Sequence, residues 1–387
     1  MKKRICFLTD SIFSFGGVQR VTAVIAKQLA LSNDVTIVTM DKPENKDTSI
    51  YGLHEADLHY RFFSYPKVGW LKWYMAKFYS MLYRKVLPKT RLASDLYVHS
   101  SFPSEKRLAL AHELQQGHYD IIIGVHAPLS VRLADCKDLL SGAMLIGWIH
   151  NSYEALFNKG SRYAGPEMRK HFEYQLEKLD LTIVLSHYDA MRYSFPTRVV
   201  YNPLTLVPGN VAEGTSKRFL AIGRFAHRHK GFDLLIKAFN IFAQKDKEWT
   251  LDLIGEGVEE PLYQQLIADY GLEQRITIHP FTKDIQQYYS NAQVYVLSSR
   301  WEGFGLVIVE AMSHGLPIVS TDLPTSREIM GDFGLYFKNE DVEDLARQLL
   351  AATRLDWAQK SQEALQIARH FDISNIITQW KNIIDGQ

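Results

Sequence analysis

Two carboxylates flank a glycine-rich turn near the C-terminal end of the chain. Glu302 follows the apolar run 293–297, and Glu310 lies in the helical pattern after the turn. Parallel sheets bind ligands beyond the carboxyl ends of their strands, so both are expected at a ligand-binding edge. A helix N-terminus there attracts an anion, and carboxylates accept hydrogen bonds from sugar or ribose hydroxyls. The turn and the start of the helix consist of Gly303, Phe304, Gly305 and Leu306.

Two cations follow another strand-like run, 218–222. Arg224 stands directly after the strand, and Lys230 precedes the next helical pattern. A guanidinium grips phosphate oxygens as a fork, whereas an ammonium acts as a point charge. Alone, this loop could be a solvated basic turn. Together with Glu302 and Glu310, it predicts a site for a phosphorylated sugar.

A glycine pair, Gly16 and Gly17, separates the first strand from the first helix, expected at 18–31. Such a pair lets backbone approach a ligand closely at a helix N-terminus, although an ordinary tight turn would use it equally. The spacing is not Gly-x-Gly-x-x-Gly, so the dinucleotide-binding fingerprint is absent.

Two histidines occupy equivalent positions in the first half of the chain. His126 follows the strand-like run 121–125, and His150 follows 144–149. A single histidine there is usually structural. Two at the same sheet edge predict a site, in which either could lie nearest the chemistry.

Strand-like and helical patterns alternate along the whole chain, which predicts parallel sheets with helices on both faces. A turn-rich linker at 202–217 separates two such runs. We expect an α/β fold of two Rossmann-like domains with a cleft between them. The first domain is 1–203, the second is 204–372, and a terminal helix at about 373–387 packs back on the first. A continuous helical region is predicted at 342–370. The other expected strands are 4–9, 34–39, 58–63, 181–185, 198–201, 250–254, 276–279, 318–321 and 335–337.

The bulk composition of the 387 residues excludes several classes of protein. A net charge of +1 argues against nucleic acid as the main partner. No segment approaches the ~20 apolar residues of a membrane span, and the N-terminus reads as a strand rather than a signal peptide. Cys6 and Cys136 lie in apolar contexts that suit buried thiols. A cytoplasmic protein is expected, one that could lie at the inner face of the cell membrane.

These motifs, in this order and spacing, resemble the retaining glycosyltransferases of family 4, which have the glycosyltransferase-B fold. The resemblance implies that Glu310 binds ribose hydroxyls and that Glu302, with the backbone after it, holds the donor sugar. Arg224 and Lys230 would take the diphosphate. Phe281 and Thr282 would line the base pocket, and His126 would approach the sugar and acceptor. Where relatives often carry an acidic or amide residue after that histidine, this chain has Ala127.

A departing diphosphate needs positive charge where negative charge develops. Many transferases hold a metal with Asp-x-Asp, which this sequence lacks. We therefore expect a metal-independent enzyme without a cofactor, in which Arg224, Lys230 and helix N-termini stabilise the leaving group. The resemblance implies front-face attack by a glycan, lipid-linked or protein acceptor. Mannosyltransferases of this family commonly have Asn-Gly-Val at the position where this chain has Tyr201-Asn-Pro. The difference favours a UDP-sugar donor.

Three alternatives remain open. Paired carboxylates also serve glycosidases, although hydrolysis needs no opposing cations. A non-catalytic partner subunit and a sugar-nucleotide epimerase would share this architecture.

The stretch 65–91 mixes aromatic residues with Lys and Arg and contains no acidic residue. Basic helices with Trp and Tyr lie in membrane interfaces, so the stretch predicts contact with an anionic membrane surface. The alternative is a helix packed in the first domain whose cations extend outward.

Overall fold

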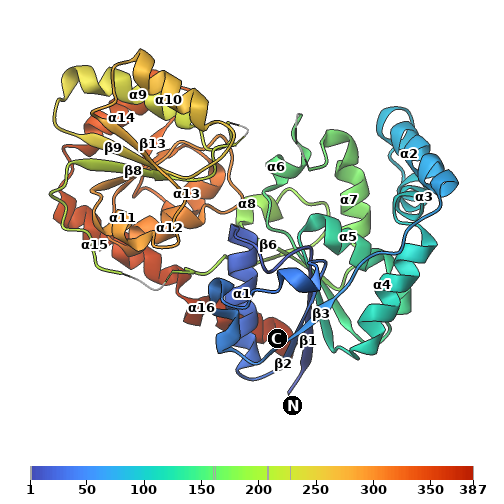
Figure 1. The fold of residues 1–387 in the computed structure, drawn as a ribbon. Helices are drawn as coiled ribbons and strands as arrows, with labels where there is room; N and C mark the ends of the chain where they lie inside the picture. The colour runs from blue at the N-terminus through green and yellow to red at the C-terminus, as the bar shows by residue number, and fades with distance from the viewer. Residues whose placement is uncertain (1, 160, 162, 207–208, 227, 387) are drawn as a thin grey trace. The chain divides into compact units, whose positions relative to one another are not determined.

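The computed structural model describes residues 2–159, 161, 163–206, 209–226 and 228–386. Contacts divide the chain into two compact units, Met1–Asn202 with Ile376–Gln387 and Pro203–Asn375. Each unit contains one parallel sheet (Figure 1). The predicted α/β fold with two Rossmann-like halves is therefore confirmed. The division falls one residue before the expected boundary, and the C-terminal helix belongs to the first unit from Ile376 onward.

The first sheet has seven parallel strands in the order β3-β2-β1-β4-β5-β6-β7. Its central strands are buried along almost their whole length, as expected for a sheet covered on both faces. The strands are β1 (Arg4–Thr9), β2 (Asp34–Thr39), β3 (Leu58–Phe62), β4 (Ile121–Val125), β5 (Met144–Trp148), β6 (Leu181–Val184) and β7 (Arg198–Val199).

Helices cover both faces of this sheet. The connections β1–α1–β2 and β4–α5–β5 run in opposite directions across it, and right-handed crossovers therefore place α1 and α5 on opposite faces. The helices of this unit are α1 (Gly17–Ala30), α2 (Trp70–Lys85), α3 (Arg91–Ser101), α4 (Ser104–Gln116), α5 (Ala127–Asp135), α6 (Tyr153–Phe157), α7 (Arg169–Leu176), α8 (His187–Ala190) and α16 (Ile373–Asp385).

The second sheet has six parallel strands in the order β10-β9-β8-β11-β12-β13. The helices α9, α10 and α14 cover one face, while α11, α12 and α15 lie on the other (Figure 1). The strands are β8 (Arg218–Ile222), β9 (Thr250–Ile254), β10 (Ile276–His279), β11 (Val294–Leu297), β12 (Ile318–Thr321) and β13 (Leu335–Phe337). The helices are α9 (Phe232–Lys245), α10 (Glu260–Asp269), α11 (Gln286–Ser290), α12 (Leu306–Ser313), α13 (Pro324–Met330), α14 (Val342–Ala352) and α15 (Trp357–Ala368).

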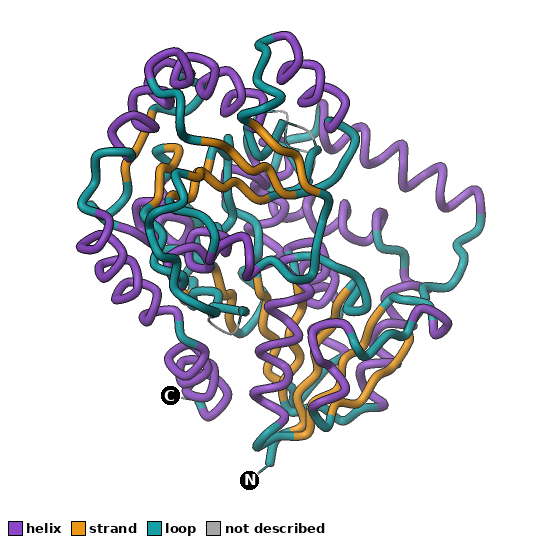
Figure 2. Tube along the Cα trace, turned by 60° about the vertical axis from the view of Figure 1, so that its left-hand side comes forward, coloured by secondary structure: helices purple, strands orange, loops and turns teal. Residues whose placement is uncertain are grey.

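Each sheet has one point where the direction of strand addition reverses. It lies between β1 and β4 in the first sheet and between β8 and β11 in the second (Figure 2 shows the strands). Helices leave opposite faces there, and in open α/β sheets ligands bind at the carboxyl edge beside such a point.

Most element boundaries agree with the sequence prediction to within one residue, and two elements differ by more. The helical region expected at 342–370 is two helices, because Asp356 interrupts it and caps α15 by accepting from the Gln359 N–H at 3.1 Å. The strand expected to reach Tyr201 ends at Val199.

In the described part of the chain, every helix is too short or too polar to cross a lipid bilayer.

Candidate active site

A buried ion pair joins the loops that follow β8 and β11. Lys230 Nζ lies 2.6 Å from Glu302 Oε1, and the side chains are 15% and 9% exposed. Ser299 donates its hydroxyl hydrogen to the same oxygen at 2.6 Å. Because β8 and β11 are neighbours at the reversal point, the pair lies where open α/β sheets bind ligands.

The pKa of Glu302 lies below its usual value. Burial alone would raise it, but the charges of Lys230 and His229 and the hydrogen bonds from Lys230 and Ser299 outweigh that effect. Glu302 is therefore a carboxylate at neutral pH. None of the hydrogen bonds among the described residues ends on its second oxygen, Oε2, which leaves that oxygen as an acceptor for a ligand hydroxyl.

A glycine permits the close approach of these two loops. Gly231 has φ 64°, and a Cβ there would lie 1.9 Å from the Ser298 carbonyl oxygen. The Ser298 hydroxyl in turn donates to the Lys230 carbonyl at 2.7 Å. Any side chain at position 231 would push Lys230 away from the end of β11.

A second ion pair also joins the loop after β11 to the segment that follows β8. Arg300, which follows β11, forms a bidentate pair with Asp233 in the first turn of α9, at 2.8 and 2.9 Å. His229 stacks on Trp301 with ring centroids 4.7 Å apart. Sequence reasoning missed these residues, although all of them adjoin predicted positions.

The turn after Glu302 presents the N-terminus of α12. Gly305 has φ 84°, which favours glycine, and no side chain among the described residues caps the helix. The neighbouring Phe304 is buried against Phe371, with centroids 5.7 Å apart. Gly303 and Leu306 are half-buried. This uncapped end can donate N–H hydrogen bonds to an anion.

Glu310 lies in the second turn of α12 and is only 2% exposed. Its Oε2 accepts from the Tyr289 hydroxyl at 2.9 Å, and its Oε1 accepts from Thr205 at 3.5 Å. The Tyr289 ring stacks on His314, which donates through Nδ1 to the Glu310 carbonyl at 2.8 Å. Sequence reasoning found Glu310 but not its contacts with Tyr289, Thr205 and His314.

The remaining predicted residues of the second unit follow β8 and β10. Arg224 is exposed, and none of the described residues makes a hydrogen bond or ion pair with its guanidinium. Its charge still helps to lower the pKa of His229, although burial of that ring is the largest cause. Phe281 (46% exposed) and half-buried Thr282 follow β10, which β9 separates from β8.

In the first unit, the glycine pair lies at the carboxyl end of β1. Tyr51 fixes this turn, because its hydroxyl accepts from the Gly16 N–H at 2.7 Å and donates to the Gly16 carbonyl at 3.1 Å. Helix α1 begins at Gly17, and no side chain among the described residues caps it. Gly16 itself is extended, a conformation open to any residue, and a Cβ there would meet only the flexible Gln19 side chain.

The two predicted histidines are neighbours at the carboxyl ends of β4 and β5. Their ring centroids are 5.5 Å apart. Burial lowers the pKa of His126, although Asp10 and a hydrogen bond with Asn151 oppose that shift. The pKa of His150 lies well below its usual value, mainly because the ring is buried and also because His126 is close to it. Both rings are therefore neutral at pH 7. His126 also has φ 78°, a strained conformation of the kind found at functional sites.

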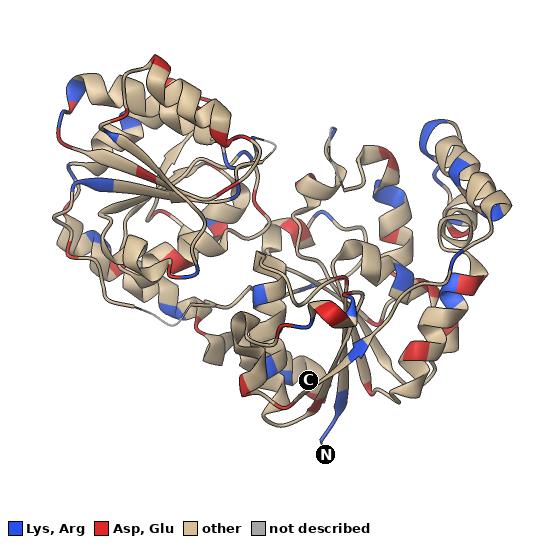
Figure 3. Cartoon of the chain, viewed as in Figure 1, with Lys and Arg blue, Asp and Glu red and all other residues tan. Residues whose placement is uncertain are grey.

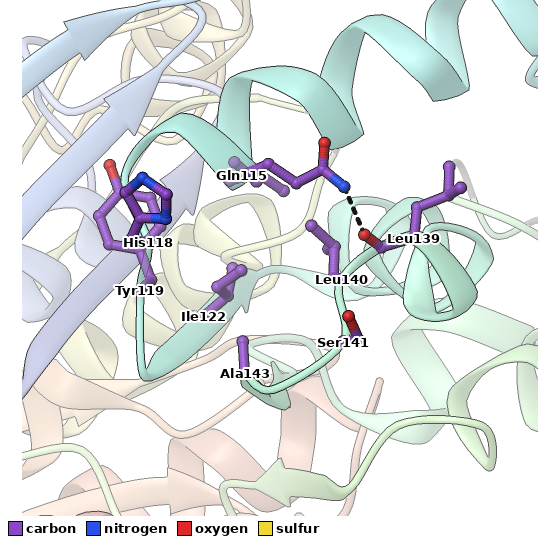
Figure 4. A pocket seen from close by; sticks show the side chains of 9 residues that line it. Gln115, His118, Tyr119, Ile122, Leu139, Leu140, Ser141 and Ala143 are labelled. Carbon is purple, nitrogen blue, oxygen red and sulfur yellow. Dashed lines mark hydrogen bonds between the residues drawn. The ribbon is translucent and has the colours of Figure 1, made fainter.

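The structure thus brings Lys230 into contact with Glu302 in the second unit and His126 beside His150 in the first. Among the described residues, no three His, Cys, Asp or Glu side chains are arranged to hold a metal ion. A hollow of about 290 Å³ beside α4 is unrelated, because its lining residues lie at the amino ends of β4 and β5 (Figure 4). There Gln115 donates to the Leu139 carbonyl at 2.7 Å.

Residues 216–354 match the family model of glycosyl transferases group 1. This segment contains both carboxylates and both cations of the predicted site. An uncharacterized glycosyltransferase of Haemophilus influenzae is 31% identical over 191 residues, covering 48% of this chain and 54% of that protein. The amylovoran biosynthesis glycosyltransferase AmsD of Erwinia amylovora is 31% identical over 173 residues, covering 43% and 48% respectively. The chain therefore spans about half the length of the curated relatives it matches.

The structural likeness to a solved protein covers the whole chain. The crystal structure of Anabaena Alr3699/HepE in complex with UDP has a TM-score of 0.75 against this chain and covers 100% of both chains, at 19% identity. At this identity the likeness establishes the fold, which is that of the glycosyltransferase-B enzymes.

Proposed function

We propose that the protein is a retaining, metal-independent glycosyltransferase. It transfers a sugar from a nucleotide-diphosphate donor, with a UDP-sugar favoured, to a glycan, lipid-linked or protein acceptor. The observation that carries this proposal is the buried Lys230–Glu302 pair at the reversal point of the second sheet, beside the uncapped end of α12. That arrangement offers a cation, a hydroxyl acceptor and free N–H groups in one place.

On the donor side, Lys230 and Arg224 neutralise the diphosphate as it leaves. Lys230 has three N–H donors, so it can bind a phosphate oxygen while it keeps Glu302. The free oxygen Oε2 of Glu302 accepts from a sugar hydroxyl, and the carboxylate of Glu310 accepts from the ribose hydroxyls. Phe281 and Thr282 contact the base.

On the acceptor side, neutral His126 and His150 hold the hydroxyl that attacks. In the proposed front-face reaction, the bond between the anomeric carbon and the diphosphate oxygen breaks as the acceptor oxygen bonds to the same face. The acceptor proton passes to the departing phosphate. The glycine turn at Gly16 and Gly17 lets the backbone approach the donor.

Two comparisons support the finer parts of the proposal. The HepE structure contains UDP, which favours a uridine donor. AmsD is named for amylovoran biosynthesis, which favours an acceptor in polysaccharide or glycoconjugate synthesis. Cys6 and Cys136 are free and buried, which suits a reducing cytoplasm, where nucleotide sugars serve as donors.

A screen of nucleotide sugars by thermal shift tests the proposal, since a bound donor stabilises the folded state by mass action. Donors that raise the Tm are then incubated with acceptors and followed by mass spectrometry. A new glycoside supports a transferase, whereas an isomerised donor would indicate an epimerase. Free sugar released from glycosides would indicate a glycosidase. Absence of donor binding and turnover would favour a non-catalytic partner subunit.

A further inference from the structure

Helix α2 presents its more apolar side to solvent. Tyr79 and Tyr83, one turn apart, face the protein, and Tyr83 is the only buried residue among those described in the helix. The opposite face, which we call the outer face of α2, has large apolar side chains at the same i, i+4 spacing. The exposed large residues are Trp70 (74%), Leu71 (58%), Trp73 (47%), Tyr74 (59%), Met75 (65%), Phe78 (60%) and Met81 (47%).

Specific contacts fix this orientation. The Tyr83 ring lies 4.7 Å from that of Tyr97 in α3, and the Tyr79 hydroxyl donates to the Ala93 carbonyl at 3.2 Å. The exposed face is therefore a consequence of how α2 is anchored. A soluble helix normally points its apolar stripe to the core and its polar face to water, and α2 does the reverse.

The cations of α2, together with Arg91, fall into two groups. Lys72, Arg84 and Arg91 pair with the acidic residues Glu105, Glu167 and Glu177 of other elements. Lys77 and Lys85 are exposed and form no ion pair within the described part of the chain. Lys77 lies 3.8 Å above the Trp73 ring, on the side of the helix that carries the apolar residues. Figure 3 shows the basic residues along α2.

We infer that the outer face of α2 docks on an anionic lipid bilayer. The helix lies in the plane of the interface, its aromatic residues enter the headgroup region, and Lys77 and Lys85 contact lipid phosphates. Trp and Tyr prefer this region, and basic side chains beside an apolar stripe attract anionic lipid.

The charge pattern favours lipid over a second copy of the chain. The cores of protein interfaces are depleted in lysine, because burying an unpaired ammonium is costly. No acidic residue occurs between positions 57 and 95 to neutralise Lys77 or Lys85 in a symmetric contact between two outer faces. An anionic bilayer suits both the lysines and the aromatic side chains of the outer face. Its headgroups neutralise the lysines, and the aromatic side chains bury their apolar surface at the boundary with the acyl chains.

Co-sedimentation with vesicles tests this inference without any donor or acceptor, so its outcome is independent of the proposed function. The full chain is mixed at low salt with vesicles of phosphatidylcholine and phosphatidylglycerol, or of phosphatidylcholine alone. We expect binding to the anionic vesicles that weakens as salt rises, because surface attraction is screened over a Debye length of about 10 Å at 0.1 M.

Two double variants separate the contributions. Lys77→Ser with Lys85→Ser should lower the partition coefficient on anionic vesicles roughly thirtyfold, and its matched control is Lys245→Ser with Lys247→Ser on the second unit. Trp70→Ser with Phe78→Ser should abolish binding while the protein stays folded, since both side chains are exposed.

Three results would overturn the inference. The first is absence of binding by the wild type at low salt. The second is equal loss in the Lys245/Lys247 control. The third is self-association without vesicle binding, detected by analytical ultracentrifugation and removed by Trp70→Ser with Phe78→Ser, which would assign this face to a second copy.

Discussion

Lys230 and Glu302 are 72 positions apart in the sequence, yet their side chains lie in contact at 2.6 Å and share a buried corner with Ser299. Removal of either charge leaves the other buried without its partner, which usually costs several kcal/mol. A loss of activity in a single variant could therefore reflect misfolding. A variant that removes both charges together serves as the control for folding.

The first prediction concerns the leaving diphosphate. Arg224→Ala and Lys230→Ala should each lower transfer about 100- to 1000-fold, as expected when one preorganised donor to a developing charge is lost. Lys245→Ala, an exposed change on the same unit, should leave the rate unchanged. Activity should persist in excess EDTA.

The folding control for that prediction is the Lys230→Ala, Glu302→Gln double variant. It removes both buried charges, so it should be more stable than Lys230→Ala in urea unfolding and still fail to transfer sugar. Full activity of the Arg224→Ala, Lys230→Ala variant, or a strict need for a divalent metal, would contradict the proposed role of these cations.

The second prediction separates the two carboxylates. Glu310→Gln should weaken the binding of free UDP at least tenfold, because Glu310 is assigned to the ribose. Glu302→Gln should leave UDP binding within about twofold and lower transfer, because the sugar is its proposed ligand. Isothermal titration calorimetry and initial rates measure the two effects. The reverse pattern would exchange the assignments.

The third prediction addresses His126. His126→Ala should lower kcat by about 100-fold and leave the Kd of UDP nearly unchanged, because the residue belongs to the first unit, whereas the side chains proposed to bind UDP belong to the second. His126→Asn is the matched variant for the backbone, since asparagine tolerates positive φ better than alanine. Equal rates for the Asn variant and the wild type would show that only the backbone conformation matters.

The fourth prediction concerns stability against pH. Burial is the main cause that lowers the pKa of His171 to about 4, with Lys178 and Arg84 acting in the same direction and Asp95 and Ser94 opposing. Between about pH 6.5 and 4 the unfolded chain binds a proton there and the native state does not, so stability falls as the pH falls. Above about pH 6.5 the unfolded chain does not bind this proton either, so the protein keeps the full stability that the neutral His171 allows.

His171→Gln lacks this titration. Between pH 7 and pH 4 the wild type should therefore lose about 3 kcal/mol more unfolding free energy than the variant. Urea unfolding at several pH values measures the difference. Parallel curves for the two proteins would show that His171 does not contribute.

The structure reduces the number of cations in 65–91 that are available to contact lipid. From sequence, every cation in 65–91 could have contacted lipid. The structure pairs Lys72 with Glu105 and Arg84 with Glu167, so these two make poor candidates. It leaves Lys77 and Lys85 on the exposed side, a distinction that depends on how α2 rotates against α3.

The sequence by itself determined the two α/β halves and the residues that follow their strands. Apolar runs of strand length and helical patterns are local signals, so the bounds of β1, β2, β4 and β8 were predicted to the residue. These local patterns do not show which strands are neighbours in a sheet. Only the tertiary structure decided that β8 adjoins β11 and β4 adjoins both β1 and β5. Those pairings place Lys230 on Glu302 and His126 beside His150, because contact between distant segments depends on strand order rather than on local propensity.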